Sequence, residues 1–409
     1  MTEPAIKVPF FRPEVGDEEI AEVTEVLRSG WLTTGPKTKI FETKFAEAVK
    51  GKHALALNSC TAALHLAIDA LGLKAGDGVL VPTETFAATA EVVRYLGGIP
   101  ILVDCDPKTL NIDLADAAKK LADLRAGRLP STIPTSTPVV GIIPVHVGGL
   151  MVDLDAVNEF AAKNHLWVVE DSAHAFPAAR RKNASAPWQR SGENTSRVSC
   201  FSFYANKTIT TGEGGMVVTN DDALISRMKL MALHGLSHDA WNRYSGGKTW
   251  DYRIVAPGYK YNMTDVASAV GIHQLARGEA MRAGREAVAR IYQKAFADQP
   301  WFELPADDSN AIHSWHLFCV RLNLSALSID RNKLFDVLRE RGVACSVHYR
   351  PLHMHPYYTD TFGWKPEHCP VATTTFDRLI SLPIFSGLRP NEIDHVIGTL
   401  LGTLKEHAR

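Results

Sequence analysis

The sequence lacks both a charge imbalance and a long apolar run. Its 409 residues include 44 basic and 45 acidic side chains, which gives a formal net charge of −1. A chain without excess positive charge offers no electrostatic case for nucleic acid or an anionic membrane as a partner. No apolar run reaches the length of a membrane span, and the first residues contain no apolar core of signal-peptide length. We therefore expect a soluble protein that binds neither nucleic acid nor membrane.

Cysteine is also scarce, and the six cysteines are scattered without a Cys-x-x-Cys pair. Thiols spread in this way are typical of a reducing compartment, so we expect a cytoplasmic protein with reduced cysteines. The hydrophobic fraction of 45% and the charged fraction of 22% are ordinary for a globular protein. The length allows one large core and a second, smaller domain.

Short apolar runs alternate with stretches of helical character between about residues 54 and 235. The runs lie at residues 79–82, 101–104, 139–145 and 166–171, and the helical stretches include 87–96 and 154–163. This alternation predicts βαβ units and a mainly parallel sheet. Two stretches without periodicity, 128–138 and 182–196, are interpreted as surface insertions.

The pattern changes after about residue 276. A long helix is expected over residues 280–297, followed by a strand at 317–322, a helix at 330–341 and a C-terminal helix after residue 391. We predict a large domain of residues 1–275, which includes an N-terminal arm, and a smaller α/β domain of residues 276–409.

Lys207 is the most informative single residue. An apolar stretch at residues 198–204 runs into it, and a glycine-rich turn at 212–215 follows. A lysine at the mouth of a strand can lose its proton by burial and attack a carbonyl to form a Schiff base. A surface lysine before a hairpin explains this stretch equally well when it is taken alone. The glycines match neither a dinucleotide fingerprint nor a P-loop, and a turn accounts for them.

Other useful side chains follow strand ends, where ligands gather in open α/β sheets. Asp171 ends an apolar run, where a carboxylate could pair with a protonated pyridine nitrogen or simply cap the next helix. Ser59 and Thr61 begin an apparent helix over 62–71, which suits either an anion site or simple N-capping. Ser202 could add a hydroxyl to the same anion. Phe86 follows a strand and could stack on an aromatic ring or belong to the core.

Together these residues form a known pattern. The matching stretches are residues 29–36, 59–65, 82–88, 170–174, 202–215, 258–265 and 347–353, with a further helix at 267–275. In order and approximate spacing the chain resembles the DegT/DnrJ/StrS family of nucleotide-sugar aminotransferases, which depend on pyridoxal 5'-phosphate (PLP). The resemblance extends over almost the whole chain. It implies an α/β fold of the aspartate-aminotransferase type (fold type I), with a mainly parallel seven-stranded sheet flanked by helices and a smaller C-terminal α/β domain. It also implies a homodimer with active sites at the dimer interface.

The resemblance assigns roles around the cofactor. It implies that Lys207 forms the internal aldimine with PLP and carries the proton, and that Asp171 pairs with the pyridine nitrogen. The implied phosphate ligands and ring contacts are Ser59, Thr61 and Ser202, the backbone of Cys60 and Ala62, the stacking Phe86, and His174 at a position that is often glutamine in the family. Lys260 stands where many relatives have an asparagine that reaches the partner subunit's phosphate, and Asn262 stands at the following arginine position. A lysine would supply a full positive charge to that phosphate.

Substrate contacts are expected on both sides of the same cleft. The resemblance implies that His313, His316, His348 and Tyr349 lie on its small-domain side, with Arg350 suited to an anion. Trp31, Thr33 and Thr34 are expected to line the cleft from the large domain. The histidine pairs 313/316 and 353/355 have no carboxylate or cysteine cluster at ligand spacing, so no metal site is predicted.

The implied reaction moves an amino group from L-glutamate to a nucleotide-linked keto-deoxysugar for deoxyamino sugar and polysaccharide biosynthesis. Amination at C3 and at C4 both remain open, as do the sugar and the nucleotide. Three alternatives are weighed on the same fold: a dehydratase, a PLP lyase, and a regulatory homologue without turnover. Dehydrating relatives have lost the active-site lysine, so Lys207 argues against the first. The retention of Lys207, Asp171 and the phosphate residues argues against the last.

Overall fold

The computed structural model describes residues 6–193, 196–236 and 253–409. Its largest element is a seven-stranded sheet with the strand order β1-β9-β8-β5-β4-β2-β3. The strands are β1 (His53–Leu57), β2 (Gly78–Pro82), β3 (Ile99–Val103), β4 (Val139–Ile142), β5 (Trp167–Asp171), β8 (Val198–Ser202) and β9 (Gly215–Thr219). Strand β9 runs antiparallel to both of its neighbours, and the other pairings are parallel. The mainly parallel seven-stranded sheet is thus confirmed.

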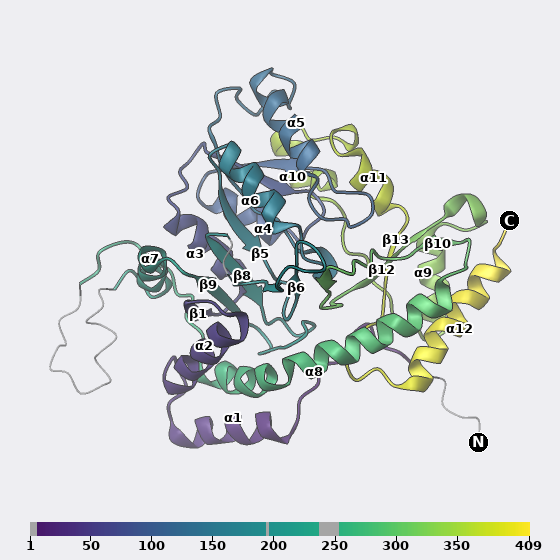
Figure 1. The fold of residues 1–409 in the computed structure, drawn as a ribbon, viewed down its shortest axis with the longest axis horizontal. Coiled ribbons are helices and arrows are strands. Elements are labelled where there is room, and N and C mark those ends of the chain that lie inside the picture. The colour runs from purple at the N-terminus through teal and green to yellow at the C-terminus, as the bar shows by residue number, and fades with distance from the viewer. Residues whose placement is uncertain (1–5, 194–195, 237–252) are drawn as a thin grey trace.

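Helices cover both faces of this sheet (Figure 1). They are α2 (Pro36–Val49), α3 (Cys60–Ala70), α4 (Ala88–Tyr95), α5 (Leu114–Arg125), α6 (Leu154–Lys163) and α7 (Asp222–Ala232). Alternate residues of one strand enter different cores: Leu55 and Leu57 pack with α3 and α7, whereas Ala56 packs with the phenylalanines of α2. Because both faces are buried, the strands are continuous apolar runs, which is why the sequence predicts them.

The observed elements follow the expected ones closely. The strands expected at 79–82, 101–104, 139–145 and 166–171 are β2, β3, β4 and β5, and the helices expected at 87–96 and 154–163 are α4 and α6. Strand β4 ends at Ile142, before Pro144, which has no N–H to donate. The two stretches that were expected to be surface insertions, 128–138 and 182–196, are partly packed into the fold. Leu129 and Ile133 pack into the core with α3, and residues 189–190 form strand β7 (Gln189–Arg190) of a small sheet with β6 (Ala179–Arg180) and β11 (Ala311–Ile312).

The C-terminal part has its own core around a three-stranded antiparallel sheet of β10 (Phe302–Glu303), β12 (Phe318–Leu322) and β13 (Leu379–Leu382). Helices α9 (Arg331–Glu340) and α12 (Pro390–Glu406) cover it, and α10 (Pro356–Phe362) and α11 (Pro370–Phe376) lie towards the large sheet. The helices expected at 330–341 and after 391, and the strand expected at 317–322, are confirmed as α9, α12 and β12.

One long helix joins the two cores. Helix α8 (Asp265–Phe296) has 32 residues. It unites the helix expected over residues 280–297 with the helix that the resemblance implies at 267–275. Its first half packs Ile272 against the phenylalanines of α2, and its second half packs Tyr292 into the C-terminal core. Figure 1 shows α8 running from the large sheet to α12. The division between residues 275 and 276, which stays a prediction, therefore falls within a continuous helix.

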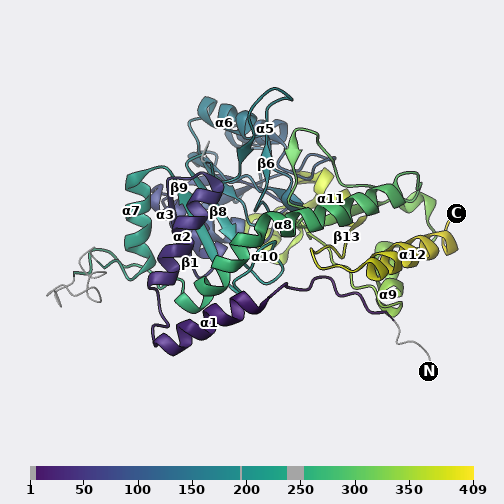
Figure 2. The same ribbon diagram turned by 60° about the horizontal axis from the view of Figure 1, so that its bottom comes forward.

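The N-terminal arm crosses the same two parts of the molecule. Val8 pairs with Val343 beside α9, and the chain then runs along α8 to helix α1 (Asp17–Ser29), as Figure 2 shows. Helix α1 packs on α8. In the ranges that the structure describes, no helix is both long and apolar enough to cross a membrane.

The start of α8 is fastened to the start of α2 by Asp265, which is 1% exposed. Its Oδ1 accepts hydrogen bonds from the N–H of Gly35 (2.7 Å) and from the N–H (2.9 Å) and hydroxyl (2.7 Å) of Thr38, and its Oδ2 accepts one from the N–H of Lys37 (3.1 Å). A helix N-terminus also favours an acidic side chain.

We expect Asp265→Ala to lower the free energy of unfolding by about 3 kcal/mol, because it leaves several buried donors without a charged acceptor. Urea unfolding followed by circular dichroism measures the change. Asp336→Ala, which breaks only the exposed pair with Arg339, serves as the control and should leave the midpoint unchanged. An equal midpoint for Asp265→Ala and the wild type would contradict this reading.

Candidate active site

Lys207 lies in the turn that follows β8, as the apolar stretch before it predicts. Its backbone N–H donates to the carbonyl of Tyr204 (2.9 Å), and its Nζ lies 3.3 Å from Nε2 of His316. The side chain is half-buried, and burial lowers the pKa of Lys207 to about 8. At pH 7 about a tenth of this amine is therefore uncharged, far more than of an exposed lysine, as a nucleophile or general base requires.

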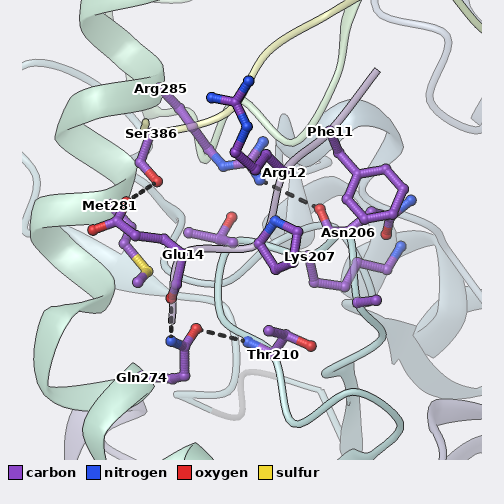
Figure 3. Close-up of a pocket in the computed structure, with 13 residues that line it drawn as sticks. Phe11, Arg12, Glu14, Asn206, Lys207, Thr210, Gln274, Met281, Arg285 and Ser386 are labelled. Atoms are coloured by element: carbon purple, nitrogen blue, oxygen red, sulfur yellow. Dashed lines mark hydrogen bonds between the residues drawn. The ribbon is translucent and has the colours of Figure 1, made fainter. Parts of the chain in front are cut away.

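The turn of Lys207 is held from behind by α8 and the N-terminal arm (Figure 3). Gln274 accepts a hydrogen bond from the N–H of Thr210 (3.2 Å) and donates to the carbonyl of Glu14 (2.7 Å). Arg285 donates to the carbonyl of Asn206 (3.3 Å). The cavity enclosed here measures about 10 Å³, room for about one water, so it is the back of the site and cannot admit a cofactor.

Asp171 ends β5 and is 5% exposed. Its Oδ2 accepts a hydrogen bond from the hydroxyl of Thr89 (2.7 Å), and its Oδ1 accepts one from the N–H of Ala173 (3.1 Å). Burial raises the pKa of Asp171, although the nearby Lys207 opposes the shift. Within the described part of the chain this carboxylate forms no ion pair, so a protonated pyridine nitrogen would supply the cation that it lacks.

A compact anion cradle forms where β9 meets α3. Ser59 caps α3, and its Oγ accepts a hydrogen bond from the N–H of Ala62 (3.1 Å). A Cβ at Gly215 would lie 2.4 Å from the Ser59 carbonyl and 2.5 Å from the Cys60 nitrogen, so only glycine lets the strand touch the helix start. Gly215 also pairs with Ser202 across β8 and β9. Four predicted phosphate contacts, at Ser59, Cys60, Ala62 and Ser202, are thus adjacent at a helix N-terminus, which favours anions.

The aromatic residues of the site are arranged around Tyr349. Phe86 is 63% exposed, which excludes the core alternative, and its ring lies 6.2 Å from that of Tyr349. Nδ1 of His174 accepts a hydrogen bond from the N–H of Gly148 (3.2 Å), so the ring proton is on Nε2, which lies 2.9 Å from the Tyr349 hydroxyl. Burial lowers the pKa of His174 well below its usual value, and His174 is therefore neutral.

These groups fit PLP. An amine with a lowered pKa, a buried carboxylate without a cation, an anion cradle at a helix start and an exposed aromatic ring are the four contacts that this cofactor needs. The residues that the sequence assigns to them come from four segments and converge at the carboxyl end of the sheet.

The structure shows what four of the predicted substrate residues contact. His313 stacks on Trp315 with ring centroids 4.0 Å apart and accepts a hydrogen bond from the Trp315 N–H, so it packs against that ring rather than beside Lys207. Burial lowers the pKa of His313 to about 3. The Thr34 hydroxyl donates to the carbonyl of Met263 (2.5 Å), and the Thr33 carbonyl accepts from the N–H of Asp265 (3.1 Å), so both lie against the start of α8. Trp31 donates from Nε1 to the carbonyl of Thr34 (3.2 Å).

The remaining substrate candidates divide by exposure. His348 bonds the hydroxyl of Ser381 through Nδ1 (2.9 Å), and burial lowers its pKa to about 4. Arg350 is exposed and donates to the carbonyl of Met354 (3.2 Å). Lys260 is exposed too, and its backbone runs beside Asn58, next to the anion cradle. In the portion that the structure describes, no three side chains of His, Cys, Asp or Glu gather as a metal site would require.

Three residues of the site were not predicted in their observed roles. His316 contacts Lys207 directly, Thr89 holds Asp171, and Glu84 accepts a hydrogen bond from the N–H of Tyr349 (2.7 Å). The clue for two of them was the short stretch after β2, where several polar residues follow a buried strand. All three contacts join segments far apart in the sequence.

Glu84 is fully buried, and its Oε2 has no partner among the described residues. Burial raises the pKa of Glu84 to about 8 from the 4.5 of an exposed glutamate, and the Tyr349 hydrogen bond only partly offsets this. The folded protein therefore keeps a proton that the unfolded chain releases. The resulting loss of stability grows as the pH rises from about 4.5 and levels off above about 8.

We expect Glu84→Gln, which mimics the protonated acid, to gain melting temperature relative to the wild type between pH 5 and pH 8 and to keep a constant lead above that. Thermal unfolding across this range measures the difference. Glu47→Gln, at an exposed position, should show an offset that does not vary with pH. A constant offset for Glu84→Gln as well would refute the protonated assignment.

Comparison with known proteins gives a consistent picture. A sequence model of the DegT/DnrJ/EryC1/StrS aminotransferase family matches residues 13–401. The spore coat polysaccharide biosynthesis protein SpsC of Bacillus subtilis is 39% identical over 399 residues, 97% of each chain. The uncharacterized protein MJ1066 of Methanocaldococcus jannaschii is also 39% identical, over 400 residues and 98% of each chain. The solved structure of the putative sugar aminotransferase Spr1654 of Streptococcus pneumoniae in its PLP form superimposes with a TM-score of 0.85 at 29% identity, over 98% of this chain and 99% of that one.

Proposed function

The chain belongs to the DegT/DnrJ/EryC1/StrS aminotransferase family, and on this premise we propose that it uses PLP to move an amino group from L-glutamate to the ketone of a nucleotide-linked deoxysugar. The observation that carries the proposal is the convergence of Lys207, Asp171 and the anion cradle. The solved structures of Spr1654, which shares the fold, include a PLP form and a PMP form. The similarity to SpsC supports a role in supplying amino sugars for polysaccharide.

The mechanism divides between the cofactor and the chain. Bound PLP supplies an aldehyde that takes up the amino group and a ring that withdraws electrons from the reacting carbon. Ser59, Thr61 and Ser202 would hold its phosphate, with the N–H groups of Cys60 and Ala62 close by. Asp171, which accepts a hydrogen bond from Thr89, would keep the pyridine nitrogen protonated, and the exposed Phe86 would stack on the ring.

Lys207 acts as the general base. Because burial lowers its pKa to about 8, its Nζ can take the α-proton of the amino donor and later return a proton in the second half of the reaction. His316, 3.3 Å away, is neutral because burial lowers its pKa well below the usual value, so its Nε2 can accept a hydrogen bond from the protonated amine. That contact would hold Nζ in place after it has taken the proton.

A homodimer would complete the site. Large apolar side chains are exposed, with Phe86 and Tyr204 beside the site and Ile254 and Val255 a few residues before Lys260. Such exposure is common where a second subunit covers a surface. In this arrangement the exposed Lys260 binds the phosphate in the partner subunit.

The six cysteines are all free thiols, which supports a reducing compartment such as the cytoplasm.

We expect Lys207→Ala to abolish the visible absorbance of the cofactor and to lower the rate of 2-oxoglutarate release at least 10²–10⁴-fold, as removal of a general base does. The assay combines L-glutamate with a panel of nucleotide-linked 3-keto and 4-keto sugars. Lys294→Ala, on the exposed side of α8, is the control and should behave as the wild type. Retained turnover in Lys207→Ala would contradict the assignment of Lys207 as the general base. Release of ammonia or pyruvate by the wild type would favour a lyase, and a colourless protein would favour a regulatory homologue.

The role of Lys260 is tested by mixing two defective chains. Lys207→Ala and Lys260→Ala are co-expressed with different tags, and the mixed dimer is purified through both. If Lys260 serves the partner's site, one of the two sites is complete, and we expect about half of the wild-type rate. Activity no greater than that of Lys260→Ala alone would show that Lys260 serves its own subunit. Failure to recover any mixed dimer would contradict the dimer itself.

A further inference from the structure

A buried arginine stands beside Lys207 without a carboxylate partner. Arg285 lies on α8 and is 4% exposed. Burial lowers the pKa of Arg285 to about 10, and no acidic side chain of the described residues opposes that shift. Desolvation of an unpaired ion is costly, so buried arginines normally face a carboxylate. The burial of Arg285 without a carboxylate therefore needs an explanation, which we sought in its contacts with the turn of Lys207.

The guanidinium binds backbone carbonyls from three separate segments. Its Nη1 donates to the carbonyl of Ile384 (2.8 Å) and to those of Trp315 and His316 (3.4 Å each). Its Nη2 donates to the carbonyl of Asn206 (3.3 Å), the contact drawn above Lys207 in Figure 3. A planar fork with five donors suits this arrangement, whereas a lysine ammonium could serve only part of it.

Two of these carbonyls adjoin the contact between Lys207 and His316. One is that of Asn206, the residue before Lys207, and the other is that of His316, whose imidazole lies 3.3 Å from Nζ of Lys207. One group therefore fixes both the backbone that carries the amine and the backbone of the residue that faces it. Gln274, about three helical turns earlier on α8, holds the far end of the same turn at Thr210.

The charge of Arg285 acts on Lys207 as well. Burial is the main cause of the lowered pKa of Lys207. The titratable and charged groups that face the amine are Asp171 on β5, Cys60 on α3, His174 after β5, His316 before β12, His348 in the C-terminal part and Arg285 on α8. Asp171 and Cys60 favour the ammonium form. Arg285 is the member of this set with a permanent positive charge, and a like charge disfavours protonation of a lysine.

We propose that Arg285 is a positioning residue for the amino-transfer reaction: it aligns Lys207 with His316 and, as an unpaired buried cation, increases the uncharged fraction of the Lys207 amine. The inference rests on the proposed role of Lys207. It explains why this cation has no acidic partner, because a carboxylate beside it would cancel the field that Lys207 experiences.

The test measures the titration of Lys207 in the full chain saturated with pyridoxamine 5'-phosphate, which leaves the lysine amine free. Brief acetylation with acetic anhydride between pH 6 and pH 10, read at the Lys207 peptide by mass spectrometry, gives the midpoint of the uncharged form. In Arg285→Gln we expect the midpoint to rise by roughly half a pH unit, which is about a threefold smaller uncharged fraction at pH 7, because burial still lowers the pKa of Lys207. Arg285→Lys keeps the charge, so its midpoint should stay near the wild type while its melting temperature falls.

Arg282→Gln is the matched control. Arg282 lies on the same helix but pairs with Glu279 and Glu286, and its loss should leave the Lys207 midpoint unchanged. An unchanged midpoint in Arg285→Gln, or an equal rise in Arg285→Lys, would reduce Arg285 to a structural residue. If Arg285→Gln does not fold, the wild-type midpoint decides, because the value of an exposed lysine there overturns the proposal.

The cofactor is assayed separately so that two failures can be told apart. A chain that does not bind pyridoxamine 5'-phosphate contradicts the proposed function. Acetylation of the same chain without cofactor then still compares Lys207 in the wild type with Lys207 in Arg285→Gln, and an equal midpoint there overturns the role of Arg285.

Discussion

The site depends on one backbone contact, the approach of Gly215 to the first residues of α3. Any side chain at Gly215 would collide with the Ser59 carbonyl, so the strand reaches the helix only because the residue is glycine. This contact sets the position of Ser202 against Ser59. It also fixes where the turn between β8 and β9 begins and ends, and Lys207 lies in that turn. The anion cradle and the reactive amine are therefore parts of one arrangement.

A second group of contacts links the large sheet to the C-terminal part. Two residues that follow β2 make hydrogen bonds to different parts of the site, one as a donor and one as an acceptor. Thr89 donates to Asp171, and Glu84 accepts from the N–H of Tyr349. The Tyr349 hydroxyl lies in turn beside His174. Asp171 and Tyr349 are thus positioned by the same short segment, which couples their geometry.

The sequence predicts the features that local chemistry controls. Strands buried on both faces are continuous apolar runs, and Asp171 and Lys207 follow two of them, so both the sheet and these residues were predictable. The start of α8 follows only from the family resemblance, which implies a helix at 267–275, because Asp265, Gly271 and Gln274 are buried in a segment without clear apolar periodicity. Nor could the sequence separate His313 from His316, three positions apart, since only the entry into β12 decides which ring faces Lys207. The contacts of Glu84 and Arg285 span long stretches of chain and leave no local pattern.

The continuity of α8 bears on how the protein can be divided. Ile272 belongs to the core around α2, Tyr292 to the C-terminal core, and Arg285 between them to the turn of Lys207. A cut within this helix would expose apolar surface on both pieces and release the reactive turn from its support. The C-terminal part is therefore not an exchangeable module. Chimeras with relatives would have to join outside residues 265–296, so that one parent supplies the whole helix.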